Sequence, residues 1–288
     1  MPAPALPLVM GVVNVTPDSF SDGGRYDTPA RAIAHARTLL AEGADILDIG
    51  GESTRPGATR PLVAEELDRV LPVIRELASE GALVSVDTMR AEVAARAIGA
   101  GAGIVNDVSG GLADPRILDV VTDSDARYVA MHWRAHSLHM QDFAVYDGPG
   151  GVVAAVRDEL AARVDAIRAA GIPDDRVILD PGLGFAKDAD HNWELLTHLD
   201  EIAGLGFPLL VGASRKTFLG RLLAGRDGQP RPVGEREEAG LAVAALLAAG
   251  LGGAPVWGLR VHEVRGTLDA IRVAGRWSAA GRVEGDHE

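Results

Sequence analysis

Short apolar segments recur along the chain, and each is followed by a polar or glycine-rich stretch and then by a run with helical periodicity. The apolar segments cover residues 8–15, 46–49, 83–86, 104–105, 128–131, 177–179, 209–211 and 258–261. The helical patterns cover residues 29–41, 64–80, 90–99, 115–123, 152–170, 192–203, 216–223, 237–249 and 264–277. Because the short segments are apolar throughout and do not alternate, they predict strands of a parallel sheet that is covered on both faces.

Eight strand and helix units in 288 residues predict an α/β protein with the fold of a (β/α)8 TIM barrel, and a doubly wound sheet is the alternative. No linker or sustained change of composition divides the chain. We therefore expect a single domain over residues 1–288, with its core from about 8 to 278. A barrel enzyme carries its chemistry at the C-terminal ends of its strands, so the residues at those eight positions bear on function.

One stretch, residues 241–259, contains no charged side chain and approaches the length of a membrane span. It consists mostly of Ala and Gly, and Pro255 interrupts it near its end. We expect a buried Ala-rich helix, a turn and a short strand in its place.

Polar residues stand where each predicted strand ends. The second strand is followed by GGESTRPG at residues 50–57, whose glycines allow a ligand to approach the backbone closely. Arg55 in this loop adds a planar donor fork that suits phosphate or carboxylate. A lone Asp at a strand end is usually a helix cap or a turn residue. Polar side chains at all eight ends are better explained as one site.

The residues at the strand ends fall into three groups by chemistry. The groups suited to a flat, amide-rich heterocycle are Asp87, Asn106, Asp180 and Lys216. The cationic groups suited to a diphosphate are Arg55, Arg260 and His262. The hard oxygen ligands that could hold Mg²⁺ against that diphosphate are Asn14 and Asp22.

Composition removes several classes of function. The absence of cysteine excludes disulfides, thiolate nucleophiles and cysteine-ligated metals. A net charge of −13 argues against a general nucleic-acid or anionic-membrane surface. The first residues lack a basic region, so we expect no secretory signal and a cytoplasmic protein. The sequence also lacks a Ser-His-Asp pattern, a zinc-protease motif and a glycine-rich nucleotide-binding motif.

Seven motifs, in this order, resemble the dihydropteroate synthases, which are the pterin transferases of the folate pathway. They are NVTPDSFSDGG (14–24), GGESTRPG (50–57), VDT (86–88), NDVSGG (106–111), DPGLGF (180–185), SRK (214–216) and RVH (260–262). The resemblance extends from about Val9 to Trp277. It implies a TIM barrel that joins 4-aminobenzoate to 6-hydroxymethyl-7,8-dihydropterin diphosphate and releases pyrophosphate with Mg²⁺ bound. It also implies a homodimer and a target of sulfonamides.

The same resemblance implies roles for individual residues. The pterin contacts and pocket walls would be Asp87, Asn106, Met131, Asp180, Phe185, Gly212 and Lys216. The diphosphate contacts would be Asn14, Arg55, Arg260 and His262, and Asn14 would also contact the metal. The residues that border the 4-aminobenzoate site would be Phe20, Thr54, Pro56, Ser214 and Lys216. The predicted catalytic residues are Asp180, Lys216, Arg55 and Asp87.

One stretch departs from the common pattern of this family. Family members usually carry Gly-x-Pro after the Met-His of the fifth strand, whereas this chain has Trp-Arg-Ala-His-Ser at residues 133–137, as actinobacterial-looking members do. The departure leaves the role of His132 open. We interpret His136 and His139 as solvated surface residues.

The reaction implied by the resemblance is expected to proceed by dissociative substitution. Asp180 would stabilise a cationic pterin, while magnesium, Arg260 and His262 would stabilise the departing diphosphate. Two long loops, rich in Gly, Ser, Thr, Asp and Pro, carry much of the predicted 4-aminobenzoate site, so we expect this substrate to bind after the pterin diphosphate.

Two other functions fit the same fold. A methyltetrahydrofolate-binding methyltransferase domain would keep the pterin contacts but would not need the diphosphate cluster. A non-catalytic homologue of the synthase would have lost residues in the loops. In this sequence both the cluster and the loop motifs are intact.

Overall fold

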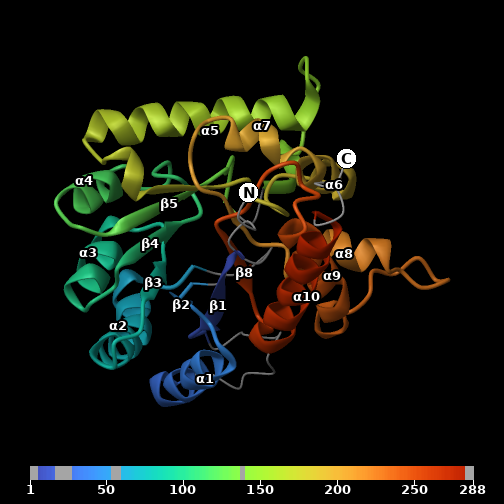
Figure 1. Cartoon of the computed structure of the whole chain (residues 1–288). Coiled ribbons are helices and arrows are strands. Elements are labelled where there is room, and N and C mark those ends of the chain that lie inside the picture. Colours follow the sequence, from blue (N-terminus) through green and yellow to red (C-terminus); the bar gives the residue numbers. More distant parts are fainter. Residues whose placement is uncertain (1–5, 17–27, 53–59, 137–139, 283–288) are drawn as a thin grey trace.

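Eight parallel strands form a nearly closed barrel with helices around it (Figure 1). The computed structural model describes residues 6–16, 28–52, 60–136 and 140–282. The strands are β1 (Leu8–Asn14), β2 (Ile46–Gly50), β3 (Val84–Asp87), β4 (Ile104–Asp107), β5 (Arg127–Met131), β6 (Val177–Asp180), β7 (Leu210–Val211) and β8 (Gly258–Val261). Their order is β6-β5-β4-β3-β2-β1-β8-β7, and a parallel bridge between Leu179 and Leu209 joins the two outer strands. The predicted single-domain TIM barrel is confirmed, and the doubly wound alternative is wrong because the two edges of the sheet meet.

The helices cover the outer face of the barrel in the order in which the sequence predicts them. They are α1 (Pro29–Glu42), α2 (Val63–Ser79), α3 (Ala91–Gly99), α4 (Arg116–Thr122), α5 (Gly151–Ala170), α6 (Ala189–Thr197), α7 (Leu199–Ala203), α8 (Thr217–Leu222), α9 (Glu237–Ala248) and α10 (Val264–Arg282). Short 3₁₀ turns lie at Met140–Phe143, Asp174–Arg176 and Val233–Glu235.

The prediction of one helix over residues 192–203 is wrong. Helix α6 begins earlier, where the Asp188 side chain accepts a hydrogen bond from the backbone N–H of His191. The chain then breaks at His198, whose φ of −132° and ψ of 40° are not helical. The next backbone N–H, that of Leu199, donates to the carbonyl of Gly252 at 3.0 Å. A tertiary hydrogen bond therefore separates α6 from α7, and the local periodicity does not reveal it.

Side chains inside the barrel alternate with side chains that face the helices. The apolar layer at the bottom of the barrel consists of Met10, Ile46, Ile104, Val129, Ile178 and Leu210, all at most 2% exposed. The side chains between strands and helices, such as Leu47 and Ile49, belong to the large core. The inward positions of β2 and β4 that lie two residues above the apolar layer carry polar groups, Asp48 and Asn106. An apolar layer therefore closes the barrel interior toward the N-terminal ends of the strands, and polar groups lie toward their C-terminal ends.

Residues 241–259 form most of helix α9, a turn and strand β8, as the sequence predicts. The helix is buried on one face only, since Val243, Ala244 and Leu247 are buried whereas Leu246 is 49% exposed. The expected buried Ala-rich helix is therefore present, and it is buried along one face. None of the helices in the described ranges has the length and apolar character needed to cross a membrane.

Candidate active site

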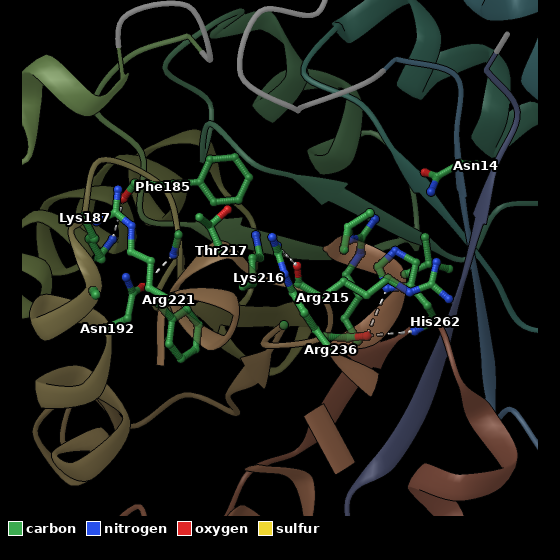
Figure 2. A pocket seen from close by; sticks show the side chains of 18 of the residues that line it. Asn14, Phe185, Lys187, Asn192, Arg215, Lys216, Thr217, Arg221, Arg236 and His262 are labelled. Atoms are coloured by element: carbon green, nitrogen blue, oxygen red, sulfur yellow. Dashed lines mark hydrogen bonds between the residues drawn. The ribbon is translucent and has the colours of Figure 1, made fainter. Parts of the chain in front are cut away.

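A cavity of about 600 Å³ opens at the C-terminal ends of the strands (Figure 2). Eight residues that the sequence analysis selects line it, namely Asn14, Asp87, Phe185, Gly212, Ser214, Lys216, Arg260 and His262. In Figure 2, Asn14 and His262 lie toward one end of the cavity, and Phe185 and Lys187 lie toward the other. The fold thus brings together side chains from β1, β3, β8 and the segments after β6 and β7.

Two buried carboxylates stand at the ends of β3 and β6. Asp180 is 7% exposed and accepts a hydrogen bond from the backbone N–H of Gly182 at 2.7 Å. Burial raises its pKa, and that hydrogen bond opposes the rise. Burial also raises the pKa of Asp87 to about 7, against the opposing charge of Arg260. Burial thus favours the protonated form of Asp87, and the Arg260 guanidinium favours its carboxylate form.

Lys216 lies beside these carboxylates at the start of α8. Burial lowers the pKa of its ammonium group to about 8, and the nearby charge of Arg260 lowers it further, whereas Asp180 and Asp87 raise it. Its Nζ atom lies 4.2 Å from the centre of the Phe185 ring, which is a cation–π contact. Met131 belongs to a small apolar cluster against which Phe185 packs. Two of the predicted walls are therefore adjacent.

Arg260 lies in the middle of the polar layer. Its Nε atom donates to Asp48 Oδ2 at 2.6 Å, and its Nη2 atom donates to Asp87 Oδ2 at 2.8 Å. Asn106 also donates to Asp48 Oδ2, at 3.1 Å. Although burial opposes it, the charges of Asp48 and Asp87 raise the pKa of the guanidinium, so Arg260 stays charged. The diphosphate contact of Arg260 stays a prediction, and in the structure its guanidinium is bonded to Asp87, one of the predicted pterin contacts.

Asp48 is a site residue that the sequence analysis missed. It is fully buried, and its Oδ2 atom accepts hydrogen bonds from both Arg260 and Asn106. It lies inside a strand that was interpreted as apolar throughout. The alternation of side chains along a strand could have revealed it, because every second residue faces the barrel interior. Asp48 stands two residues after Ile46 of the apolar layer and therefore faces inward as well.

His262 and Ser214 form a pair at the ends of β8 and β7. The Ser214 Oγ atom lies 3.0 Å from His262 Nδ1 and accepts a hydrogen bond from the His262 backbone N–H at 3.3 Å. Ser214 was expected near 4-aminobenzoate, but its hydroxyl faces the residue expected at the diphosphate. The hydroxyl-bearing residue on the other side of Lys216 is Thr217, which lines the cavity and was not selected from the sequence.

Arg215 has a left-handed backbone, with a φ of 61°. Such a conformation is strained in a residue other than glycine and needs support from its surroundings. Glu237 accepts a hydrogen bond from the Arg215 side chain, and Arg236 donates to the Arg215 carbonyl at 2.9 Å. These contacts hold the segment between β7 and α8 in a conformation that the SRK motif alone does not predict.

The remaining predicted residues, Phe20, Asp22, Thr54, Arg55 and Pro56, lie outside the described residues, as does His139. Among the predicted metal contacts the structure describes only Asn14, which lines the cavity. The described part of the chain contains no group of three or more His, Cys, Asp or Glu residues able to hold a metal ion.

His136 is exposed, as expected, and its ring meets the ring of Trp133 edge to face at 5.0 Å. His132, in contrast, is buried, with 1% of its surface exposed.

Comparison with known proteins gives consistent results. The family model for pterin binding enzymes matches residues 10–262. The dihydropteroate synthase of Mycobacterium leprae is 52% identical over 275 residues, which cover 95% of this chain and 94% of that protein. Among solved structures, the Yersinia pestis dihydropteroate synthase with a sulfonamide drug complex has a TM-score of 0.86 at 37% identity, with 95% of each chain covered. The Xanthomonas albilineans dihydropteroate synthase with 4-aminobenzoic acid has a TM-score of 0.83 at 44% identity, covering 96% of this chain and 93% of that chain.

Proposed function

Because this chain belongs to the family of pterin-binding enzymes and has the activity of a dihydropteroate synthase, we propose which of its residues carry out each part of that reaction. The reaction forms a bond between the arylamine nitrogen of 4-aminobenzoate and the exocyclic methylene carbon of the dihydropterin. It breaks the bond from that carbon to the diphosphate oxygen, and the amine releases one proton. The alternatives of a methyltransferase domain and a non-catalytic homologue are not supported.

The pterin ring binds in the polar layer above the apolar floor of the barrel. The observation that supports this assignment is that Asp87, Lys216 and Arg260 line one cavity. The buried Asp180 lies near enough for the charges of Lys216 and Arg260 to lower its pKa. A carboxylate there accepts hydrogen bonds from the ring N–H and the 2-amino group, while Lys216 donates to ring acceptors. Asn106 supports the layer through Asp48. Phe185 and Met131 pack against the ring faces.

The substitution is dissociative, with the diphosphate leaving before the amine attacks. The electron-rich pterin spreads the positive charge that develops on the methylene carbon, and the buried Asp180 carboxylate stabilises that charge. His262 and Arg55 stabilise the departing diphosphate, and Asn14 contacts it. A strong general base is not needed, because the arylamine is neutral at pH 7 and loses its proton after attack.

A magnesium ion fits the Asn14 end of the cavity as a partner of the substrate diphosphate. Mg²⁺ is usually held by one or two protein oxygens together with phosphate oxygens and waters, so the amide oxygen of Asn14 is a sufficient protein contact. Asp22 is the second proposed contact. When bound, the ion neutralises charge that develops on the leaving diphosphate.

We also propose that the enzyme is a homodimer. The adjacent helices α9 and α10 leave large apolar side chains in solvent, with Leu246 49%, Val273 68% and Trp277 82% exposed. Exposed apolar groups of this size are commonly covered in an assembly. Sedimentation of the wild type and of Trp277→Glu tests the proposal, with a dimer expected for the first and a shift to monomer for the second. A cytoplasmic location stays a prediction.

Pyrophosphate release on mixing both substrates with magnesium tests the function directly. A methyltransferase domain would release none. The order of binding is tested by calorimetry, in which 4-aminobenzoate alone should bind weakly and a pterin ligand with magnesium pyrophosphate should tighten it by at least about tenfold. Equal affinity under both conditions would refute the ordered binding and leave the pyrophosphate test unaffected.

A further inference from the structure

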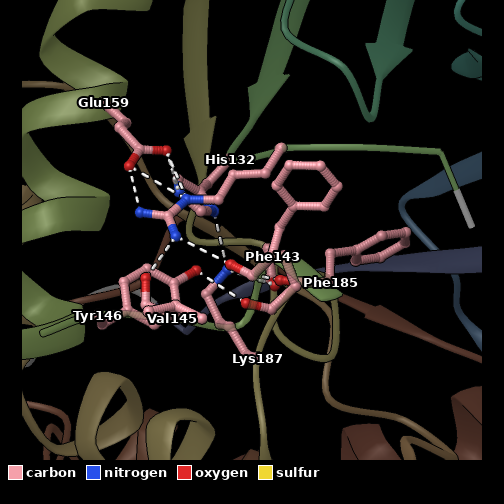
Figure 3. A network of polar contacts seen from close by, with 10 residues as sticks. His132, Phe143, Val145, Tyr146, Glu159, Phe185 and Lys187 are labelled. Carbon is pink, nitrogen blue, oxygen red and sulfur yellow. Dashed lines mark hydrogen bonds and ion pairs between the residues drawn. The ribbon is translucent and has the colours of Figure 1, made fainter. Parts of the chain in front are cut away.

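A buried lysine holds the turn that follows β6, next to the proposed pterin site (Figure 3). Lys187 is 3% exposed, and its Nζ atom donates to the carbonyls of Gly182 and Phe185 at 2.9 and 3.0 Å. The same atom lies 2.8 Å from Nδ1 of His132, at the end of β5. All three donors of the ammonium group are therefore used, and two of them bind the backbone of one turn.

His132 continues the contact outward to helix α5. Its Nε2 atom lies 2.9 Å from Glu159 Oε2. An ammonium group can only donate, so Nδ1 of His132 accepts from Lys187 and Nε2 carries the proton that is donated to Glu159. Burial and the charge of Lys187 lower the pKa of His132 to about 4, which agrees with a neutral ring. Glu159 is thus the carboxylate end of a hydrogen-bonded chain that runs from Lys187 through His132.

Arg134 completes this chain on the protein surface. It donates to the Glu159 carboxylate through Nε and Nη2, and its Nη1 atom donates to the carbonyls of Phe143 and Val145 at 2.9 and 2.8 Å. Although burial opposes the change, hydrogen bonds from His132 and Arg134 lower the pKa of Glu159 to about 2. The guanidinium also lies 4.0 Å from the centre of the Tyr146 ring.

The sequence departure at residues 133–137 supplies this arginine. The common family form has Gly-x-Pro at that place. In this chain the segment brings Arg134 to Glu159, and the Tyr146 hydroxyl donates to the carbonyl of Ala186 at 2.9 Å. The loop and the turn after β6 are therefore joined at two points, through the Lys187 chain and through Tyr146.

The turn itself leaves little room for change. Gly182 has a φ of 69°, and a Cβ atom there would lie 2.4 Å from the carbonyl oxygen of His132. Its N–H donates to Asp180, and three residues later Phe185 lies against the Lys216 ammonium. The position of this turn consequently fixes both the carboxylate and the aromatic wall of the cavity.

We propose that Lys187, held by the chain of His132, Glu159 and Arg134, is a positioning residue that sets the Asp180 and Phe185 contacts for the pterin ring. The proposal rests on the pterin site assigned above. Lys187 acts through the turn and takes no part in bond breaking. The chain holds two cations, Lys187 and Arg134, and one carboxylate, Glu159, which is paired with Arg134. The nearby charge of Asp180 also favours the protonated form of Lys187.

Binding of 6-hydroxymethylpterin, measured by calorimetry without 4-aminobenzoate, tests the proposal. Lys187→Met keeps the length of the side chain and removes its three donors, and we expect affinity to fall by about tenfold. The matched control is Asp158→Asn, which changes an exposed carboxylate beside Glu159 on the same helix and should bind like the wild type. If wild type fails to bind the pterin, the assigned site is wrong. If wild type and Lys187→Met bind equally, only the positioning role is wrong.

A second pair of variants separates positioning from simple filling of space. His132→Gln retains one acceptor and one donor, whereas His132→Leu is of similar volume and has neither. We expect the glutamine variant to bind the pterin within about threefold of the wild type and the leucine variant to resemble Lys187→Met. The ¹⁵N shifts of the His132 ring in wild type, recorded at pH 6, where Lys187 is an ammonium group, should show protonated Nε2 and unprotonated Nδ1. Equal binding by the two His132 variants, or the opposite tautomer, would overturn the proposal even if Lys187→Met did not fold.

Discussion

The charge of Asp48 organises the polar layer of the barrel, and Asp48→Asn isolates that charge. One Asp48 oxygen, Oδ2, accepts from both Arg260 and Asn106, and an amide oxygen in the same place can accept both hydrogen bonds. The other oxygen, Oδ1, is buried without a partner among the described residues. The variant therefore keeps the geometry, removes the negative charge and leaves a buried amide N–H without an acceptor.

The expected cost follows from these contacts. Removing one partner of a buried ion pair costs roughly 3–5 kcal/mol, but Arg260 retains Asp87 as a second partner at 2.8 Å. An orphaned buried N–H adds roughly 1–3 kcal/mol, while the two retained hydrogen bonds weaken to neutral ones. We expect a loss of about 2–3 kcal/mol in the free energy of unfolding. Since Asp48 is one cause of the raised pKa of Asp87, that pKa should also fall below about 7.

Urea unfolding measures the stability, and pterin calorimetry from pH 5.5 to 8.5 measures the shift of Asp87. Ser85→Ala is the matched control, because Ser85 pairs with Asp48 across the strands and its hydroxyl is also buried without a partner in the described structure. That variant should be neutral or slightly stabilising. An Asp48→Asn protein within about 0.5 kcal/mol of the wild type, with an unchanged pH profile, would refute the role of the charge.

Further outcomes follow from the other charged residues. Asp180→Asn keeps its shape but loses the charge that stabilises a cationic pterin, so turnover should fall about a hundredfold, and steady-state kinetics within threefold of the wild type would contradict the role. Arg55→Lys keeps a charge but loses the planar fork, so kcat/KM for the pterin diphosphate should drop clearly; unchanged kinetics would exclude bidentate binding. Burial lowers the pKa values of Lys187 and Lys216 to about 7 and about 8, below the value of about 10.4 for an unfolded chain. The unfolded state therefore binds more protons above pH 7, and stability should rise from pH 7 to about 10, less steeply in Lys187→Met.

The sequence was sufficient to predict the barrel because each unit repeats a local pattern. Every predicted strand is present within one or two residues, since buried parallel strands produce short apolar runs that end at polar residues. The break at His198 could not be predicted, because it depends on the hydrogen bond from Leu199 to the distant Gly252. Local periodicity contains no information about that contact.

The location of a candidate site residue was predictable where the residue stands at a strand end, as for Asp87 and Asp180. Residues that act through a second residue were missed. Lys187 lies just after a recognised motif, and its role depends on a ring from β5 and a carboxylate from α5. Those contacts join residues that are 27 and 55 positions apart along the chain, and neither spacing nor residue type indicates them.

Asp48 could have been found by a more careful use of the strand period. In β2, Ile46 and Asp48 both face the barrel interior, and in β4 Ile104 and Asn106 repeat the arrangement. An apolar residue with a polar residue two positions later therefore indicates a strand whose inward side chains belong first to the apolar layer and then to the polar layer. The outward residues between them are apolar as well, which makes the strand look uniformly hydrophobic.

The composition of this upper layer bears on the charge of the reacting pterin. Among the described residues, Asp48, Asp87 and Asp180 contribute three carboxylates, while Arg260 and Lys216 contribute two cations. When Asp87 is ionised, above about pH 7, the layer therefore has one carboxylate more than it has cations. A cavity with an apolar floor screens this excess poorly, so a developing positive charge on a bound ring is stabilised more strongly than it would be in water. The excess negative charge stabilises a dissociative step, in which the pterin becomes cationic before the amine attacks. A concerted displacement would develop less positive charge on the ring and would be stabilised less.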